Sequence, residues 1–350
     1  MRVLIDTSYV SRGRSGTSVY EERLVDALRR EGEVEVVEAR QRRRFRRGRS
    51  GGGWNPLRTA ANALIDQAWL QLGLPRAARQ SGADVVHHPL PAHSRRIPCA
   101  QVATVHDVAF ERVPRAYGRA WRLFARRQYR RAGRHSDAVV VVSEATARDV
   151  MDLLGTDRSR IVVAHHGPGQ ALPQVERDPE PRHFLYLGDA EIRKDVLPLV
   201  TAFASGGWAL PLLLAGSSAR LAEGENVHPE PNPSPERVAE LFAGAAALVH
   251  PAEYEGFGLT LVEAMAAGVP VVARRTPSAE EVCGDAALLF DDQQFKEPLE
   301  RIAADPQLRE RLSAAGRERA ARFSWEKSAR RHLAAYTLAK ETRARAGGPA

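Results

Sequence analysis

Short, mainly apolar runs alternate with amphipathic stretches along nearly the whole chain. Residues 3–5, 102–105 and 183–187 are runs of the kind that form buried strands. Between such runs, residues 19–30 and 145–154 carry apolar side chains at helical spacing. A buried strand, a glycine-containing loop and a helix together begin a βαβ unit. The alternation therefore predicts an α/β protein with mainly parallel sheets.

The chain is long enough for two domains. It has 350 residues, of which 43% are hydrophobic and 27% charged, a balance typical of globular proteins. A polar, proline-rich segment interrupts the alternation, which then starts again. We predict an N-terminal Rossmann-like domain over residues 1–168, a linker over 169–181 and a C-terminal Rossmann-like domain over 182–323. A closing helix is expected over 324–340.

One turn in the second half carries the strongest chemical signal. The apolar run at residues 245–250 reads as a strand, and a helix is expected to begin at Leu259 and to end before Gly268. Gly256 and Gly258 lie between the two. Glycines at a strand-to-helix turn expose backbone N–H groups, and the helix dipole makes that end attractive to anions. The turn therefore indicates a phosphate-binding site.

Two carboxylates flank this turn. Glu255 precedes it, and Glu263 follows about two helical turns further along. Carboxylates repel phosphate, so they suit hydroxyl groups on either side of it, those of a sugar ring and of a ribose. A plain turn and a solvated helix face are the structural alternative. Because strand, turn, helix and carboxylate spacing coincide, we favour a site for a nucleotide-diphosphate sugar.

The stretch from Glu255 to Glu263 resembles the E-x7-E motif of retaining glycosyltransferases with the GT-B fold, in glycosyltransferase family 4, which includes bacterial mannosyltransferases. The resemblance implies two facing Rossmann-like domains with the active site in the cleft between them, the first binding the acceptor and the second the nucleotide sugar. It implies that Glu255 contacts the sugar and Glu263 the ribose. Gly256, Phe257, Gly258 and Leu259 would then contact the donor through backbone N–H groups.

A second motif follows the strand at residues 183–187. Gly188, Arg193 and Lys194 match the family pattern G-x(4)-R-K, and Asp195 stands where the family usually has asparagine. A cationic pair beyond a strand end can reach a diphosphate, with arginine bidentate and lysine a point charge. We predict that Arg193 and Lys194 neutralise the leaving diphosphate. A solvated surface pair is the alternative.

The first half offers His106 and Asp107 directly after an apolar strand. They resemble the family's His-Asp pair, in which the histidine faces the sugar opposite the leaving group, so His106 is the candidate for donor-sugar contact. Gly16 belongs to a loop that resembles the family's N-terminal glycine loop, a candidate for acceptor or phosphate contact together with Asp107. His87 and His88 either line the acceptor pocket or end a strand.

The resemblance implies retaining transfer of a hexose to a hydroxyl acceptor on a glycan or lipid in polysaccharide or glycolipid assembly. Front-face attack is expected, because no enzymic nucleophile is evident. GDP-mannose is the first expectation for the donor, with a UDP-hexose as the alternative. No metal-ligand set is evident in the sequence, and no cofactor is expected besides the donor.

The basic composition needs its own explanation. Of 51 basic residues 47 are arginine, and the net charge is +8, which we attribute to codon bias more than to nucleic-acid binding; nucleic acid is not expected as a partner. Cys99 and Cys283 make no metal or redox spacing, so a cytoplasmic location is predicted. Arginines and aromatic residues interleave along residues 119–134, which suits either peripheral contact with an anionic membrane at the inner face of the cell membrane or a buried aromatic face with solvated arginines.

Two other functions fit the sequence less well. A Rossmann dehydrogenase or epimerase requires GxGxxG directly after the first strand, and residues 12–16 do not have that spacing. A polyanion-binding protein would act through the arginine run at residues 40–49. Few aromatic residues accompany that run, so the transferase is favoured.

Overall fold

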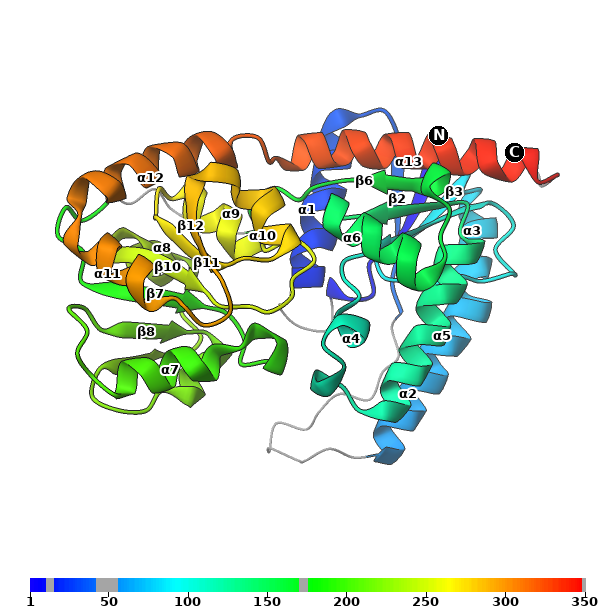
Figure 1. Ribbon diagram of the computed structural model, residues 1–350. Helices are drawn as coiled ribbons and strands as arrows, with labels where there is room; N and C mark the ends of the chain where they lie inside the picture. The colour runs from blue at the N-terminus through cyan, green and yellow to red at the C-terminus, as the bar shows by residue number, and fades with distance from the viewer. Residues whose placement is uncertain (11–15, 42–55, 170–175, 348–350) are drawn as a thin grey trace.

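The computed structural model describes residues 1–10, 16–41, 56–169 and 176–347 (Figure 1). These residues form two α/β domains, each built on a parallel sheet, which confirms the predicted fold class. The arginine run considered as an alternative polyanion-binding site lies outside the described residues from residue 42 onward, as do residues 170–175 of the predicted linker.

The first sheet has six parallel strands in the order β2-β1-β3-β4-β5-β6. Strands β1, β5 and β6 consist largely of buried valine, isoleucine or leucine, and β3 and β4 are buried along their whole length, as expected for a sheet covered on both faces. The strands are β1 (Arg2–Asp6), β2 (Glu35–Ala39), β3 (Val85–His88), β4 (Ala100–Val105), β5 (Ala138–Val141) and β6 (Ile161–Val163).

The second sheet also has six parallel strands, in the order β12-β11-β10-β7-β8-β9. Its chain order reverses between β7 and β10, and in open α/β sheets ligands bind beyond the carboxyl ends of strands at such a point. The strands are β7 (His183–Leu187), β8 (Leu212–Ala215), β9 (Val227–Glu230), β10 (Ala245–His250), β11 (Val271–Arg274) and β12 (Ala287–Phe290).

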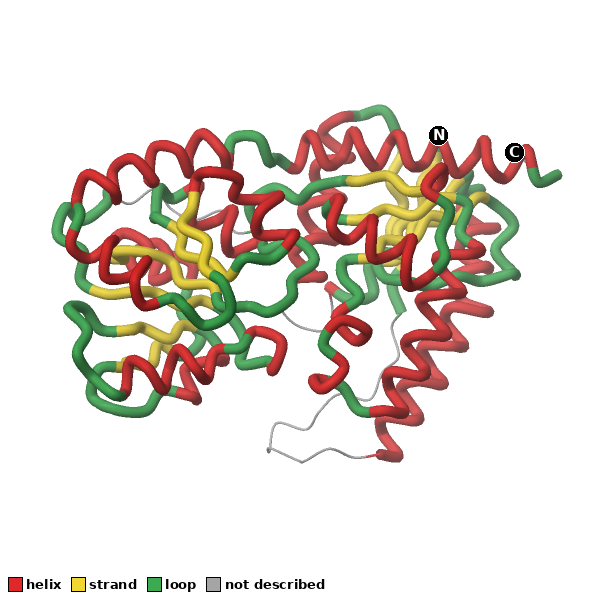
Figure 2. Tube along the Cα trace, viewed as in Figure 1, coloured by secondary structure: helices red, strands yellow, loops and turns green. Residues whose placement is uncertain are grey.

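Helices cover both sheets, as the tube trace in Figure 2 shows. Those of the first domain are α1 (Gly16–Glu31), α2 (Pro56–Ala68), α3 (Leu74–Ser81), α4 (Ala109–Arg112), α5 (Arg119–His135) and α6 (Glu144–Asp149). Those that follow are α7 (Val196–Ala204), α8 (Pro235–Ala243), α9 (Leu259–Ala266), α10 (Pro277–Cys283), α11 (Lys296–Ala304), α12 (Pro306–Ala320) and α13 (Trp325–Arg345).

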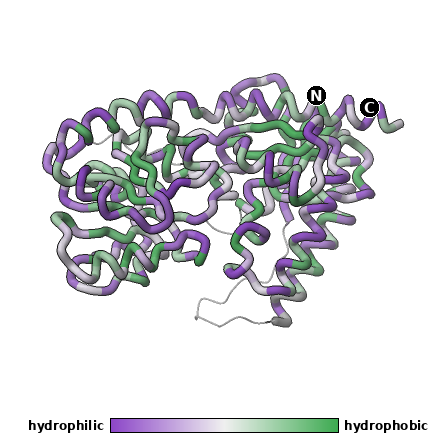
Figure 3. The backbone as a smooth tube through the Cα atoms, viewed as in Figure 1, coloured by the Kyte–Doolittle hydropathy of each residue, from purple (hydrophilic) through white to green (hydrophobic). Residues whose placement is uncertain are grey.

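Helix α13 returns from the second domain and lies across the first (Figure 1). Its Trp325, Ala329, Leu333 and Tyr336 belong to the same buried cluster as Val3 of β1. Hydrophobic strands lie inside each domain, and hydrophilic residues lie along the outer helices (Figure 3). The last helix therefore ties the two domains together through apolar burial.

Three local features differ from the sequence expectations. Residues 57–72, whose apolar side chains predict a single helix, form α2 followed by a π-helical turn, η2 (Trp69–Gly73), which continues into α3. The helix expected over 145–154 likewise ends in a π-helical turn, η4 (Val150–Leu154). A strand, β9, is present where the prolines after residue 226 argue against one, and it holds Pro229 at the edge of the sheet, where a missing N–H is tolerated.

In the part of the chain that the structure describes, no helix is both long enough and apolar enough to cross a bilayer.

Candidate active site

The glycine turn after β10 lies against the first domain. Gly258 has φ of 94° and caps the N-terminus of α9, a conformation that side chains rarely adopt. A Cβ built on Gly256 would lie 1.8 Å from the carbonyl oxygen of His106, so no side chain fits there. The predicted turn and helix are therefore present, and the turn touches the predicted His-Asp pair.

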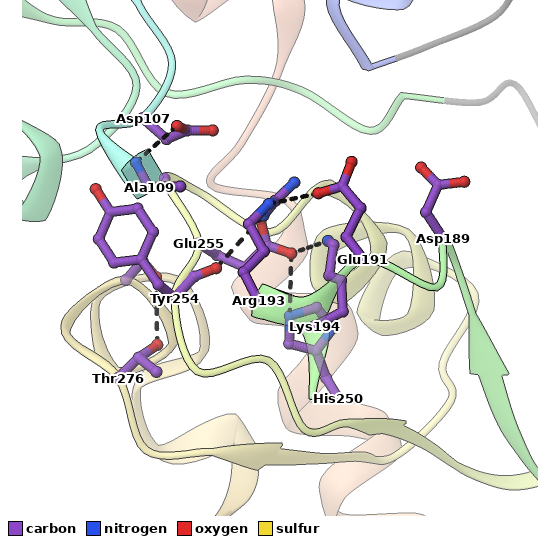
Figure 4. A network of polar contacts seen from close by, with 12 residues as sticks. Asp107, Ala109, Asp189, Glu191, Arg193, Lys194, His250, Tyr254, Glu255 and Thr276 are labelled. Carbon is purple, nitrogen blue, oxygen red and sulfur yellow. Dashed lines mark hydrogen bonds and ion pairs between the residues drawn. The ribbon is translucent and has the colours of Figure 1, made fainter. Parts of the chain in front are cut away.

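Glu255 lies between the two predicted cations (Figure 4). Its Oε2 accepts a hydrogen bond of 3.0 Å from Nη1 of Arg193, and its Oε1 accepts one from Nζ of Lys194. The three side chains are only 12%, 14% and 16% exposed, respectively. Arg193 is also held by Glu191, whose Oε2 lies 2.7 Å from Nε. The structure therefore brings together the three second-domain residues predicted to handle sugar and diphosphate.

Charge–charge interactions govern the ionisation of this cluster. Burial by itself would raise the pKa of Glu255, but Lys194, Arg193 and His250 outweigh it and lower that pKa to about 2. Burial opposes the charge of Arg193, yet Glu255 and Asp107 raise its pKa. At neutral pH Glu255 is consequently ionised beside the charged guanidinium group of Arg193.

His250, the last residue of β10, lies next to Glu255 in the cluster. Its Nε2 is 3.5 Å from Oε1 of Glu255, and burial lowers the pKa of His250 to about 4, so the ring is neutral at pH 7. Gly188 follows β7, on the other side of the point where strand order reverses. The cluster thus lies at the point where the strand order reverses, which is where open α/β sheets bind ligands.

His106 and Asp107 reach this region from the end of β4. Nε2 of His106 donates a 2.9 Å hydrogen bond to the carbonyl of Pro89, and the ring packs edge-on against Tyr20 at 4.7 Å. Burial lowers the pKa of His106, so the ring is neutral with its proton on Nε2, which leaves Nδ1 as an acceptor. Oδ1 of Asp107 accepts the N–H of Ala109 at 3.0 Å.

The other predicted site residues lie in the turn or beside it. Phe257 is buried with its ring near His165, His166 and Phe323, so its side chain is not available to a ligand. Glu263 is buried on α9. A Cβ on Gly16 would lie 3.9 Å from the side chain of Leu259, which places the start of α1 beside the start of α9.

Asp195 adopts the left-handed conformation, with φ of 48°. Asparagine and aspartate are the residues other than glycine that tolerate it best. Its carboxylate also accepts a 2.9 Å bond from Arg274. The departure from the family's asparagine therefore preserves the backbone conformation after Lys194.

Several contacts between the domains were missed by sequence reasoning. The hydroxyl of Ser143, which accepts the N–H of Thr146 and so caps α6, also donates to the carbonyl of Gly256 at 2.6 Å. The hydroxyl of Tyr254 donates to Asp149 at 2.7 Å and accepts the N–H of Val108 at 3.2 Å. No periodicity identifies Tyr254, because it lies in a loop and its partners are distant in sequence.

Glu281 forms another such contact. Its two carboxylate oxygens accept the N–H groups of Glu144 and Ala145 at 2.8 and 2.9 Å, at the start of α6, and one of them lies 2.7 Å from Nε2 of His165. A carboxylate is favoured at a helix N-terminus because of the helix dipole. Glu281 therefore joins α10 of the second domain to α6 of the first.

His87 and His88 have different surroundings. His87 is fully buried and bonded to Thr104 at 2.8 Å and to the hydroxyl of Tyr336 at 2.9 Å, so it is a core residue. His88 bonds to Gln101 at 3.2 Å and lines a cavity of about 210 Å³ in the first domain. Among the described residues, no group of three histidine, cysteine or acidic side chains is arranged to hold a metal ion.

Comparison with known proteins agrees with this geometry. The family described as Glycosyl transferases group 1 matches residues 170–319, and Glycosyltransferase Family 4 matches residues 14–167. The chain is 30% identical over 302 residues to the MMP alpha-(1->4)-mannosyltransferase of Mycolicibacterium hassiacum, which is 75% of this chain and 72% of that relative. It is 27% identical over 267 residues to O-antigen chain mannosyltransferase B of Escherichia coli, 68% of this chain and 70% of the relative.

The solved structures agree in fold. Sucrose-phosphate synthase from Thermosynechococcus elongatus superposes with a TM-score of 0.75 at 18% identity, over 96% of this chain and 98% of that chain. At 18% sequence identity this similarity is evidence for the fold alone. Taken with the family matches, it shows that this chain belongs to glycosyltransferase family 4 and is a glycosyltransferase of the GT-B fold.

Proposed function

We propose that this protein transfers a hexose, with retention of configuration, from a nucleotide-diphosphate sugar to a hydroxyl group of a glycan or lipid-linked acceptor. The observation that carries the proposal is the buried cluster of Glu255, Arg193 and Lys194 beside a glycine turn that lies on the backbone of His106. The cluster brings charges for a diphosphate and acceptors for sugar hydroxyls to one place where the two domains meet.

Arg193 and Lys194 have the chemistry that the leaving group requires. When the bond from the anomeric carbon to the phosphate oxygen breaks, negative charge grows on the diphosphate. Two preorganised cations in a poorly hydrated site stabilise that charge strongly, with no metal in the proposal. Backbone N–H groups of the turn at Gly256 and Gly258 would hold the phosphates, and Glu263 would accept hydroxyl groups of the ribose.

His106 and Glu255 would hold the hexose from opposite domains. Nδ1 of His106 is an acceptor for a sugar hydroxyl, since Nε2 already donates to Pro89. In front-face attack the acceptor oxygen bonds to the anomeric carbon on the side that the phosphate oxygen leaves. The acceptor proton passes to that departing oxygen, so configuration is retained and no enzymic base is consumed.

For the donor we propose GDP-mannose first, with a UDP-hexose as the alternative. The support is the name of two relatives, a mannosyltransferase in each case. The products would belong to polysaccharide or glycolipid assembly.

The acceptor is proposed to bind in the first-domain cavity of about 210 Å³. It lies beside the ends of β1 and β3, where the strand order of the first sheet reverses. Aromatic side chains and carboxylates share its walls, a combination suited to sugar rings, and its lining includes Asp6, Asp66, Trp69, His88, Trp121 and Tyr129. Nε1 of Trp69 donates to Asp6 at 3.0 Å, which fixes one wall.

Calorimetric titration with GDP, UDP and their sugar conjugates tests the donor site. We expect one nucleotide to bind, and Lys194→Gln to weaken that binding at least tenfold, because a charge-assisted contact to phosphate is lost. Lys296→Gln, which removes an exposed lysine of α11, is the matched control and should bind as the wild type does. Equal binding by both variants would contradict the assigned role of Lys194.

A further inference from the structure

The outer face of α5 is an unusually basic surface. The helix carries seven arginines and no acidic residue, and only Ala125, Ala132 and Gly133 are buried along it. In Figure 1 it runs down the side of the first domain, away from α11 and α12. A helix with so narrow a buried face leaves most of its side chains available to a partner.

Few of these arginines have a carboxylate partner. Arg126 pairs with Glu111, with Nη2 and Oε2 2.5 Å apart, whereas Arg122 and Arg130 donate to backbone carbonyls. Within the described residues no carboxylate lies within ion-pair distance of Arg127, Arg131 or Arg134. The charge on this face is therefore largely uncompensated.

The arginines enclose a hollow of about 700 Å³. Its lining contains no carboxylate and consists of Arg95, Leu123, Arg126, Arg127, Arg130, Arg131, Arg134 and His135. Burial and four neighbouring arginines lower the pKa of His135, in keeping with a positive local potential. A hollow of this size with guanidinium groups around it has the chemistry to bind several phosphates.

Apolar side chains stand beside the charges. Leu123 is 71% exposed, Phe124 52% and Trp121 48%, all on the first turns of α5. A nucleic acid would use stacking platforms, but Leu123 is the one large apolar side chain among the residues that line the hollow. The rings of Trp121 and Phe124 line the cavity on the other side of the helix, and Trp121 is stacked on Tyr117 at 5.0 Å. A row of arginines next to an exposed leucine matches the interface of an anionic bilayer better.

We propose that the outer face of α5 docks this protein onto an anionic lipid bilayer. Guanidinium groups of Arg127, Arg131 and Arg134 would bind headgroup phosphates, and Leu123 would enter the boundary of the acyl chains. The opposite side of the same helix contributes Trp121 and Tyr129 to the proposed acceptor cavity. Docking would therefore bring a membrane-held acceptor to that cavity, a consequence that rests on the proposed function.

Vesicle flotation tests the docking without any substrate. Each arginine near an anionic surface contributes roughly fivefold to binding, so the triple variant Arg127→Gln, Arg131→Gln, Arg134→Gln should bind phosphatidylglycerol-containing vesicles roughly 100-fold more weakly. The matched control removes three exposed arginines of the second domain, Arg220, Arg301 and Arg311, and should bind as the wild type does. Leu123→Ser should reduce the binding that persists at high salt.

The outcomes are separable. Binding to phosphatidylglycerol vesicles but not to pure phosphatidylcholine, lost in the triple variant alone, supports the proposal. Equal binding to both vesicles, equal loss in the control variant, or binding to single-stranded RNA without binding to vesicles overturns it. Thermal unfolding of each variant reports on the fold, and nucleotide titration of each reports on the donor site, so failure of docking and failure of the proposed function are distinguished.

Discussion

Replacing Glu255 by glutamine tests whether the buried carboxylate balances two cations. The substitution keeps the shape and removes the charge. The pKa of Glu255 falls from its ordinary 4.5 to about 2 in the folded protein, which corresponds to about 3 kcal/mol of stability at neutral pH. We expect Glu255→Gln to lower the free energy of unfolding by about that amount, because Arg193 and Lys194 lose their partner.

The sign of the pH dependence follows from the same pKa. The folded pKa of this carboxyl is depressed, so its contribution is complete above pH 4.5 and disappears as the pH falls toward 2. The stability difference between wild type and Glu255→Gln should consequently be constant from pH 5 to 7 and shrink below pH 4.5.

Denaturant titration followed by circular dichroism measures this difference. The matched control is Glu253→Gln on the same loop, whose pairing with Arg115 is exposed and should contribute less than about 1 kcal/mol. Equal, small losses in both variants at pH 7 would refute the reasoning, as would a difference for Glu255→Gln that does not change with acid.

The same variant separates binding from turnover. Glu255 competes with a diphosphate for Arg193 and Lys194, so Glu255→Gln should bind the free nucleoside diphosphate as tightly as the wild type or more tightly. Turnover should fall roughly 100- to 1,000-fold, since the sugar loses an oriented acceptor. A parallel loss of nucleotide affinity would show that the carboxylate supports the phosphate site and not the sugar.

Three further predictions follow from the contacts between the domains and from the charge of the site. Gly256→Ala should reduce turnover at least 100-fold, because the new methyl group would overlap the carbonyl of His106, while Gly118→Ala, with nothing within 4 Å, should be silent in the same assay. Glu281→Ala should lower the free energy of unfolding, measured by chemical denaturation, by about 1–3 kcal/mol, because two N–H groups of α6 lose their acceptor. An equal loss of stability in Glu280→Ala, at an exposed position, would contradict this. Chelation with EDTA should leave nucleoside diphosphate release unchanged, and restoration of a lost rate by Mg²⁺ would show that Arg193 and Lys194 do not suffice.

Much of the fold could be predicted from the sequence because local patterns and tertiary structure agree. Most strands are apolar runs, and the glycine turn precedes a helix, as predicted. Among the strands the exception is β9, because Pro229 in the sequence suggests a break in the strand. An edge strand tolerates it because one side of the strand makes no ladder bonds.

The contacts between the two domains could not be predicted from the sequence, for a physical reason. Periodicity identifies the face of a helix or strand that is buried, but not the distant residue that covers it. Arg193 and Lys194 could be placed beyond a strand end, yet their shared hold on Glu255 depends on the strand order of the sheet. The roles of Tyr254 and Glu281 could not be assigned from local pattern, since their partners lie more than 100 residues away.

The most direct test of the central claim is nucleoside diphosphate release from GDP-mannose and from a panel of UDP-hexoses, by the wild type and by Glu263→Ala, with the fold of each checked by circular dichroism. The account predicts release from one donor by the wild type and at least a 100-fold loss in a folded Glu263→Ala. Release that persists in the variant, or a wild type that neither releases nor is thermally stabilised by any donor, would contradict it.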